Sequence, residues 1–253
     1  MDALGTAIAI GSPLGDVGAA FYFSPEAAAR ASAIGLDVVS LYAAGRGGVL
    51  GDRTPAEVDE AFFFFKAGLI GGVVEAARRT ADPADILDAH IGSAADYAVA
   101  TFSAVDTGVL AAFDAAASRV VAGLETGRWP LVDGYRKVHA PTEPAARAYL
   151  QAVLMRELRG GVHREAVVAA GLSAAVACQF DRGDDYYRLH GFGEGDRVPE
   201  TPEVLATRAS AEGATDRAVA GFLAVLDETQ AAALVSGVEA MVAAGATVTL
   251  PVL

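Results

Sequence analysis

Residues 184–193 gather the side chains of this chain that are best suited to proton transfer. The segment contains Tyr186, Tyr187 and His190 among acids, an arginine and glycines. Histidine changes its charge near neutral pH, so a histidine beside a phenol can act as a general acid or base. We therefore take His190 and Tyr187 as candidate catalytic residues and Tyr186 as a ligand contact. The simpler interpretation is a surface loop stabilised by pairing between its own aspartates and Arg188.

Two arginines at equivalent places could bind a carboxylate or carbonyl group. Arg46 and Arg182 each follow a Gly-Leu pair at the same interval, and the two motifs stand 136 residues apart. The planar guanidinium can donate two parallel hydrogen bonds to a carboxylate. We expect both arginines to contact a ligand across the junction of two halves. Alternatively, each forms a salt bridge inside its own half, with Asp96 and Asp216 as the corresponding acids.

Aromatic side chains are concentrated at residues 21–23 and 62–65. Four consecutive phenylalanines would cover every face of a helical turn, so at least one ring must face solvent, another helix or a cavity. The pattern predicts either an aromatic pocket for a planar or apolar ligand, or a contact between halves or between two copies of the chain. For the pocket we assign Tyr22, Tyr42, Phe63 and Phe64 as ligand contacts.

The four histidines show no spacing that is typical of a metal site, and we expect no metal. His163 begins an expected helix, where it either caps the N-terminus or contacts the ligand. The single cysteine, Cys178, lies among apolar residues and is interpreted as a small buried hydrophobe. No P-loop, dinucleotide fingerprint or nucleophile elbow is present. The sequence leaves the cofactor unknown and does not decide whether the protein is an enzyme.

The net charge of -13 and the presence of only two lysines limit the kinds of binding partner that the protein can have. Nucleic-acid binding depends on clustered Lys and Arg, so this balance argues against a nucleic-acid partner. No window approaches the roughly 20 uninterrupted apolar residues of a membrane helix. Residues 1–20 lack the basic start and cleavage site of a signal peptide. We expect a cytoplasmic protein that does not bind membranes.

The chain predicts an all-α fold, because Ala, Leu, Glu and Arg dominate and apolar residues recur at three and four. Helix starts are marked by pairs such as Ser24-Pro25 and Thr54-Pro55. We expect helices over residues 25–34, 37–44, 55–65, 83–105, 107–124, 143–158, 163–170, 173–181, 202–226 with a break at Gly213, and 228–243. The glycines after Ala44 are read as a helix stop, and residues 247–250 as a short strand.

Two stretches share one plan, which predicts an internal duplication. Besides the Gly-Leu and Arg-Gly motifs, residues 96–102 and 216–222 share Asp, Ala-Val-Ala and Phe at equal places. We expect two pseudo-symmetric helical halves, residues 1–126 and 145–253, packed face to face. Residues 127–144 are rich in Pro and Gly and form the linker between them.

Several of these motifs, in this order, resemble a family of uncharacterised actinobacterial proteins described as helix-turn-helix proteins. The resemblance rests on residues 21–26, Gly35-Leu36, residues 42–46, residues 154–172 and Thr215-Asp216. It implies a largely helical protein with a region similar to a winged helix-turn-helix in the second half. Relatives usually carry an Arg-Gly-Trp motif there, whereas residues 190–202 of this chain are short, glycine-rich and acidic, a degenerate form of that region.

Two functions follow from the sequence. In the first, the two halves enclose an aromatic-lined cavity that binds an organic small molecule, as a carrier or catalyst in secondary metabolism. In the second, the chain is a dimeric transcriptional regulator whose helices around residues 163–182 contact DNA. The charge balance and the degenerate wing favour the first.

Overall fold

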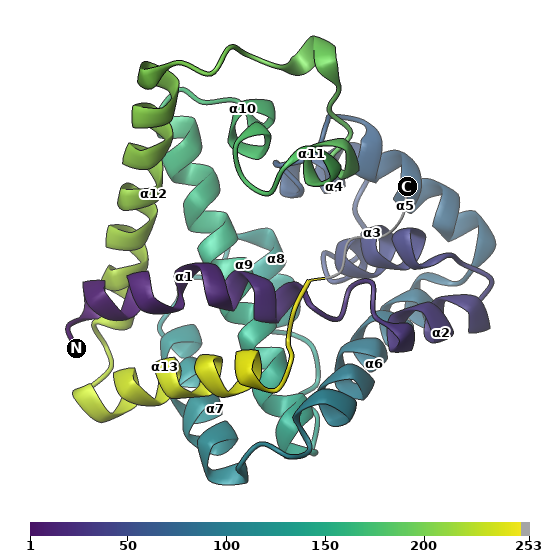
Figure 1. Cartoon of the computed structure of the whole chain (residues 1–253). Coiled ribbons are helices and arrows are strands. Elements are labelled where there is room, and N and C mark those ends of the chain that lie inside the picture. The colour runs from purple at the N-terminus through teal and green to yellow at the C-terminus, as the bar shows by residue number, and fades with distance from the viewer. Residues whose placement is uncertain (249–253) are drawn as a thin grey trace.

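The computed structural model describes residues 1–248 and is built from helices joined by short connections (Figure 1). No strand occurs in this range. The α-helices are α1 (Ala3–Ala19), α2 (Pro25–Ala33), α3 (Val38–Gly48), α4 (Pro55–Ala61), α5 (Leu69–Thr80), α6 (Pro83–Phe102), α7 (Thr107–Ala122), α8 (Pro130–Tyr135), α9 (Pro144–Ala169), α10 (Ala174–Gln179), α11 (Asp184–Leu189), α12 (Pro202–Leu223) and α13 (Glu228–Ala243). A single 3-10 turn, η1 (Glu194–Asp196), precedes α12. The predicted all-α class is confirmed.

Most helices begin at the caps that the sequence indicates. Ser24 accepts a hydrogen bond from the Ala27 amide at the start of α2. Thr54 and Glu57 form a reciprocal capping box at the start of α4. Such caps satisfy backbone N–H groups that have no partner inside the helix. Local chemistry therefore fixes where these elements start, and packing decides where they end.

Helix α9 is the central element of the fold. It runs through the middle of the molecule, with α1, α6, α7 and α12 packed around it (Figure 1). Its residues from Ala145 to Val162 supply much of the core, and one cluster of buried apolar side chains joins them to both ends of the chain. Since α9 is apolar on several faces, it lies inside the protein rather than on its surface.

The predicted helix stop after Ala44 is wrong, because α3 continues to Gly48. Gly45 lies against α6, where an added Cβ would come within 2.3 Å of the His90 Cβ. Glycine is required at this position for the close approach of two helices, not for a turn. As a result Arg46 stands inside a helix and is largely buried, with 9% of its surface exposed.

The expected helix over the four phenylalanines is also wrong. Helix α4 ends at Ala61, and residues 62–65 form a turn before α5. Both carboxylate oxygens of Asp59 accept hydrogen bonds from backbone amides at the start of α5, from Gly68 at 3.1 Å and from Gly71 at 2.9 Å. Because this contact fixes a new helix start, the phenylalanine rings are presented from a turn and can point in different directions.

The predicted boundaries around the linker need correction. One continuous helix, α9 (Pro144–Ala169), replaces the two helices expected over residues 143–158 and 163–170. Gly161 lies inside it and packs under Trp129, whose Cδ1 would be 2.4 Å from an added Cβ. Trp129 is buried and precedes the short helix α8, so part of the expected linker belongs to the core.

Three smaller expectations differ from the structure. Residues 184–189 form helix α11 after Gly183, whose φ of 83° favours glycine. Helix α12 passes through Gly213 without a break, because Ala211, Thr215 and Val219 are buried on either side. The expected strand at residues 247–250 is not formed at 247–248, and its remainder lies outside the described residues.

The two Gly-Leu motifs adopt the same backbone structure. Gly35 and Gly171 have φ values of 76° and 71° and terminate α2 and α9. The amides of Leu36 and Leu172 each donate a hydrogen bond back into the preceding helix. An N-capping side chain, Asp37 or Ser173, starts the next helix.

No single helix among residues 1–248 is long and apolar enough to span a membrane, although α2 and α3, which meet at 84°, reach that length and apolarity together.

A basic, aromatic-lined cavity as candidate functional site

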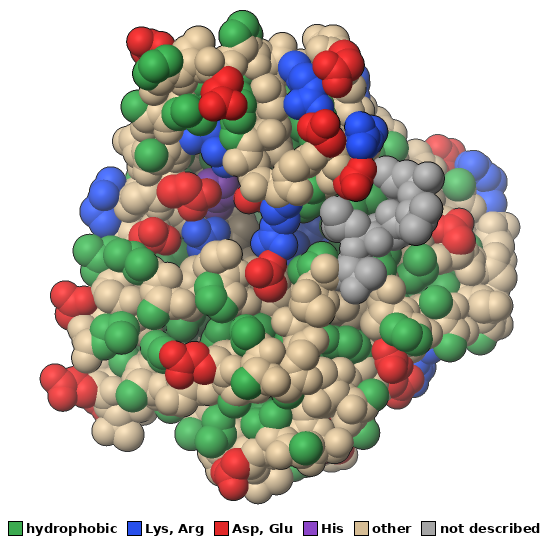
Figure 2. Space-filling view, viewed as in Figure 1, with side chains coloured by type: hydrophobic (Ala, Val, Ile, Leu, Met, Phe, Trp, Pro, Cys, Tyr) green, Lys and Arg blue, Asp and Glu red, His purple; other side chains and the backbone are tan. Residues whose placement is uncertain are grey.

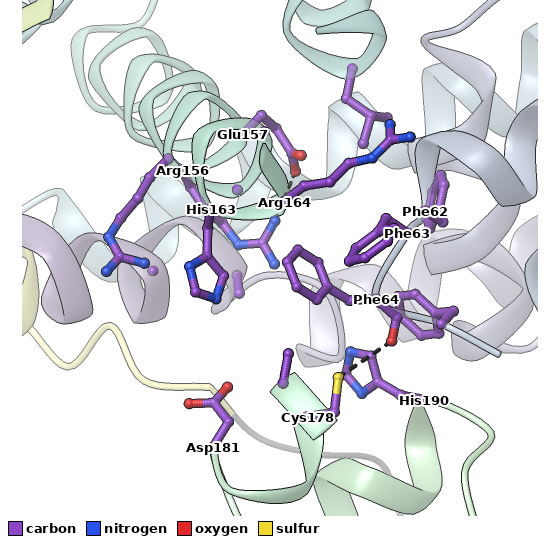
Figure 3. A pocket seen from close by; sticks show the side chains of 18 of the residues that line it. Phe62, Phe63, Phe64, Arg156, Glu157, His163, Arg164, Cys178, Asp181 and His190 are labelled. Carbon is purple, nitrogen blue, oxygen red and sulfur yellow. Dashed lines mark hydrogen bonds and ion pairs between the residues drawn. The ribbon is translucent and has the colours of Figure 1, made fainter. Parts of the chain in front are cut away.

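One large cavity lies between α9, the turn at residues 62–65 and the segment that holds α10 and α11. Its volume is about 370 Å³, and α1 and α12 complete its wall. Figure 2 shows a hollow in the surface at the position of this cavity, with arginine or lysine side chains and a histidine exposed inside it. In Figure 3, Phe63, Phe64 and His163 point into the same space, opposite Cys178 and Asp181.

Nine of the ten site residues predicted from the sequence line this cavity. They are Tyr22, Tyr42, Arg46, Phe63, Phe64, His163, Arg182, Tyr186 and His190. They come from both halves of the chain and are separated by up to 168 positions in sequence. The fold therefore brings the predicted residues together, while their role in binding or catalysis stays a prediction.

The exception is Tyr187, which does not line the cavity. Its ring is fully buried, 5.4 Å from that of Phe192, and the Arg197 guanidinium lies 4.7 Å from its centre. Its hydroxyl is buried and has no hydrogen-bond partner among the described residues. Successive residues of a helix point about 100° apart, so Tyr186 and Tyr187 cannot both face the cavity. The expected pair of His190 with Tyr187 is replaced by His190 with Tyr186.

His190 packs between two aromatic rings at the cavity wall. Its ring lies 4.2 Å from Phe65 and 4.1 Å from Tyr186, centre to centre. Burial, together with the nearby Arg46 and other guanidiniums, lowers its pKa to about 4, against a hydrogen bond to the Tyr186 carbonyl. At neutral pH His190 is uncharged. Its Nδ1 lies 2.8 Å from that carbonyl oxygen and must carry the proton, which leaves Nε2 unprotonated.

The pairing that the simpler interpretation of residues 184–193 predicts also occurs in the structure. Arg188 lies 2.7 Å from Asp185, and Asp184 lies 2.7 Å from Arg197. These are exposed pairs, and such pairs stabilise a fold only weakly.

A buried charge cluster forms the deep end of the cavity. Arg46 donates to both carboxylate oxygens of Glu157, from Nε at 2.9 Å and from Nη2 at 2.7 Å. The Arg156 Nη1 donates to the Glu157 Oε1 at 2.8 Å, and the Tyr22 hydroxyl lies 3.3 Å from the same oxygen. The Arg46 guanidinium stacks 4.4 Å from the centre of the Phe62 ring. One carboxylate is thus shared by two guanidinium groups.

Glu157 remains ionised inside the protein. Burial alone would raise its pKa, but Arg46, Arg156 and their hydrogen bonds hold it at about 2. Arg156 and Glu157 were not among the site residues predicted from the sequence. The available signal was the spacing, because Glu157 follows the buried Leu150 by seven positions and therefore lies on an apolar face of α9.

Arg46 and Arg182 line the same cavity but do not form the expected pairs within each half. Arg46 binds Glu157, and Arg182 binds Asp16 of α1. Asp96 pairs instead with Arg30 at 2.6 Å, and Asp216 lies 3.6 Å from Arg159. The expected pairs of Arg46 with Asp96 and of Arg182 with Asp216 are therefore wrong, although Arg182 also lies 3.7 Å from Asp181 in its own half.

His163 lies at the other end of the cavity, between α9 and α12. Its ring stacks on Phe64 with centres 5.4 Å apart, and its Nδ1 lies 3.0 Å from the Thr215 hydroxyl. Its Nε2 lies 3.5 Å from Glu212. Burial lowers the pKa of His163 and raises that of the neighbouring Asp181. His163 stands well inside α9 and does not cap a helix start.

The cavity wall is basic although the protein is acidic. Its charged residues are Arg46, Arg156, Arg159, Arg164, Arg182 and Arg208 against Glu157, Asp181 and Glu212. With neutral histidines the wall therefore carries an excess of three positive charges, whereas the whole chain carries -13.

The remaining chemistry of the wall is limited. Cys178 is buried, its Sγ donates to the Phe64 carbonyl at 3.3 Å, and burial raises its pKa to about 12. Among the described residues no group of three or more His, Cys, Asp and Glu side chains could hold a metal ion. A second hollow of about 240 Å³ between α1 and α13 is lined almost entirely by apolar side chains.

Comparison with known proteins places the chain in a family. Residues 9–191, well over half of the chain, match the model of a helix-turn-helix family. This protein belongs to the helix-turn-helix family. The matched range contains α9, the turn at Gly171 and α10, which form two helices joined by a tight turn. No curated protein and no solved structure matches the chain.

The family corrects one expectation drawn from the sequence. The net charge argued against a nucleic-acid partner, but a helix-turn-helix family suggests nucleic-acid binding. Net charge sums the whole surface, whereas binding depends on the local arrangement of basic groups.

Proposed function

We propose that this helix-turn-helix family protein binds an organic small molecule in the cavity between its two halves. One observation carries the proposal: residues from the ranges 11–65 and 129–212, together with Val248, line one hollow of about 370 Å³. Pockets for organic ligands are usually a few hundred Å³ in volume, with apolar and aromatic walls and a few polar groups. The phenylalanine turn supplies the apolar wall, and the Arg46 cluster supplies the polar groups.

The proposal includes the two-half organisation expected from the sequence. Residues 1–126 and 145–253 would descend from one duplicated helical unit, with residues 127–144 between them. The similar backbone φ angles of Gly35 and Gly171 support this duplication. The helix pairs α6–α7 and α12–α13, which follow in the same order in the two halves, also support it. Under this proposal, the cavity would lie at the junction of the two copies.

Catalysis is a narrower form of the same proposal. His190 is uncharged, and its unprotonated Nε2 could accept a proton from a bound molecule. Tyr186, whose phenol is kept protonated by burial, lies beside it. A carrier needs only the walls of the cavity, whereas a catalyst in secondary metabolism would also need His190.

Nucleic-acid binding is the second candidate function, and the family match favours it. Helix α10 follows α9 after the turn at Gly171, and its Ala177 and Cys178 also line the cavity. A ligand in the cavity would therefore touch the second helix of the motif. A gel shift at low salt with the upstream region of the coding sequence tests this function. A specific shift would support it, and no shift above that of random DNA would count against it.

Binding in the cavity can be tested with the neutral dye N-phenyl-1-naphthylamine, which fluoresces in apolar surroundings. A Cβ added at Gly160 of α9 would meet no atom within 4 Å, and this residue lines the cavity. Gly160→Phe should therefore fill the hollow without straining the helix. Gly72→Phe is the matched control, since Gly72 is equally open but lies on the exposed face of α5.

We expect saturable binding of one dye to the unmodified protein and to Gly72→Phe, and at least about tenfold weaker binding to Gly160→Phe. Equal binding to all three proteins would place the dye elsewhere and contradict the proposal. Circular dichroism checks that each variant keeps its helix content.

A further inference from the structure

The charge cluster at the deep end of the cavity contains a guanidinium without a carboxylate of its own. Arg46 uses Nε and Nη2 on both oxygens of Glu157, and its Nη1 lies 3.5 Å from the Tyr42 hydroxyl. Each of its three nitrogens therefore has a partner. Arg156 shares the same carboxylate through Nη1 alone. One positive charge of this trio remains uncompensated among the described residues.

Arg156 has donors left for a ligand. Its Nη1 also lies 3.3 Å from the Tyr22 hydroxyl, while its Nε and Nη2 make no hydrogen bond to the described residues. The side chain is 24% exposed, compared with 10% for Arg46 and 2% for Glu157. An ionised group that is largely withdrawn from water gains strongly from a partner of opposite charge. Arg156 is thus better placed than Arg46 to bind an anion.

The fold holds Arg156 in place from behind. Gly18 of α1 lies against its stem, and an added Cβ at Gly18 would come within 2.8 Å of the Arg156 Cβ. The guanidinium lies 5.2 Å from the centre of the Tyr22 ring. Because α1 and Tyr22 restrict the side chain, less freedom is lost when a ligand binds.

The other arginines of the wall differ from Arg156 in the partners that they contact. Arg159 pairs with Glu212 at 2.9 Å, Arg182 binds Asp16, and Arg164 lies over the Phe63 ring. Arg208 donates to the Ala177 carbonyl. Arg159 has two acids beside it, Glu212 and Asp216, although its buried Nε lacks a hydrogen-bond partner among the described residues. Arg156 differs from Arg159 because it must share its carboxylate, Glu157, with a second guanidinium.

We propose that the cavity binds an aromatic organic anion, a carboxylate or sulfonate, whose charged group is held by Arg156 and whose ring lies against the phenylalanine turn. This inference rests on the small-molecule binding proposed above and names the class of ligand. Phe62, which stacks on Arg46, links the charged end of the cavity to the rings of Phe63 and Phe64. A flat ring that bears one negative charge fits a cavity with guanidinium groups at one end and phenylalanine rings beside them.

Two dyes of the same skeleton separate charge from shape. 1-Anilinonaphthalene-8-sulfonate carries a sulfonate, and N-phenyl-1-naphthylamine lacks it. The net charge of -13 would repel the sulfonate from the general surface, so any preference for it must arise locally. We expect the unmodified protein to bind the sulfonate dye at least about tenfold more tightly than the neutral dye.

Arg156→Met should weaken binding of the sulfonate dye by about ten- to one-hundredfold and leave the neutral dye within about twofold. Retained binding of the neutral dye also shows that the variant is folded. Arg30→Met is the matched control, because Arg30 lies outside the cavity and is paired with Asp96 at 2.6 Å. It should change sulfonate binding by less than about threefold. Arg156→Lys, which keeps the charge, should recover part of the loss.

Equal affinity of the unmodified protein for the two dyes would overturn the anion inference and leave the binding proposal standing. A loss of both dyes in Arg156→Met, with sulfonate binding restored no further in Arg156→Lys, would also overturn it, because Arg156 would then act only on the fold. If the unmodified protein binds neither dye, the small-molecule proposal itself fails.

Discussion

Replacing Glu157 with glutamine should cost more stability than any exposed charge change in this protein. Glu157 is 3% exposed and holds the guanidiniums of Arg46 and Arg156 through three hydrogen bonds. The amide keeps the shape of the side chain but removes its charge. Glu157→Gln would leave two buried guanidinium groups without a counter-ion, and such a loss typically costs about 3–5 kcal/mol.

The pKa of Glu157 gives a second estimate of the same size. Its fall from 4.5 to about 2 means that the folded protein prefers the ionised form by about 3 kcal/mol. Both figures describe the interaction of the carboxylate with its guanidinium partners after the cost of burial.

Urea unfolding at pH 7, followed by circular dichroism, measures this effect. We expect a loss of about 3–4 kcal/mol for Glu157→Gln and of less than about 1 kcal/mol for Asp96→Asn, which breaks the exposed pair with Arg30. The double variant Arg46→Met/Glu157→Leu should lose less than the sum of its single changes. A loss below about 1 kcal/mol for Glu157→Gln would refute the reasoning, since the carboxylate could then not be holding the cluster together.

Two further predictions concern buried histidine and buried glycine. Burial, helped by the charge of Arg46, lowers the pKa of His90 to about 3, and that of His190 falls to about 4. The unfolded chain binds more protons than the folded protein below about pH 6.5, so stability should fall by about 4 kcal/mol between pH 7 and pH 5. Urea unfolding at both pH values measures this, and His190→Gln should remove about half of the loss; a flat profile would be inconsistent with neutral buried rings. Gly45→Ala should destabilise the protein by about 1–3 kcal/mol, because the added Cβ would clash with His90. Gly72→Ala should be neutral or stabilising, since nothing lies near an added Cβ there. Thermal unfolding measures both effects, and equal effects at the two positions would contradict the close packing of α3 on α6.

The helical class and most helix starts could be predicted because they depend on local chemistry. Ser24-Pro25, Thr54-Pro55 and Asp82-Pro83 each supply a capping side chain and a proline at the first helical position. These signals act within a few residues and are visible in the sequence.

Helix ends and glycine roles could not be predicted in the same way. Gly45 and Gly161 look like helix stops, yet each lies inside a helix and makes room for one side chain of another element, His90 or Trp129. These contacts join residues at least 32 positions apart in sequence. Only the packed structure shows whether a glycine ends a helix or makes room for a neighbouring side chain.

The candidate site was predicted better from residue type than from pairing. The clustered aromatic residues, the histidines and the repeated arginines that the sequence singled out do meet at one cavity, and nine of the ten predicted residues line it. Tyr187 failed because helix α11 turns it away from its neighbour Tyr186. Glu157 was missed because its role depends on Arg46, which lies 111 residues earlier in the chain.

The central claim is that the cavity beside α9 accepts an aromatic anion. The most direct test is a crystal structure of the protein with 1-anilinonaphthalene-8-sulfonate. We expect the dye between α9 and the turn at residues 62–65, with its sulfonate within hydrogen-bonding distance of Arg156. A dye bound instead in the apolar groove between α1 and α13, or side chains filling the space beside Arg156, would contradict the account.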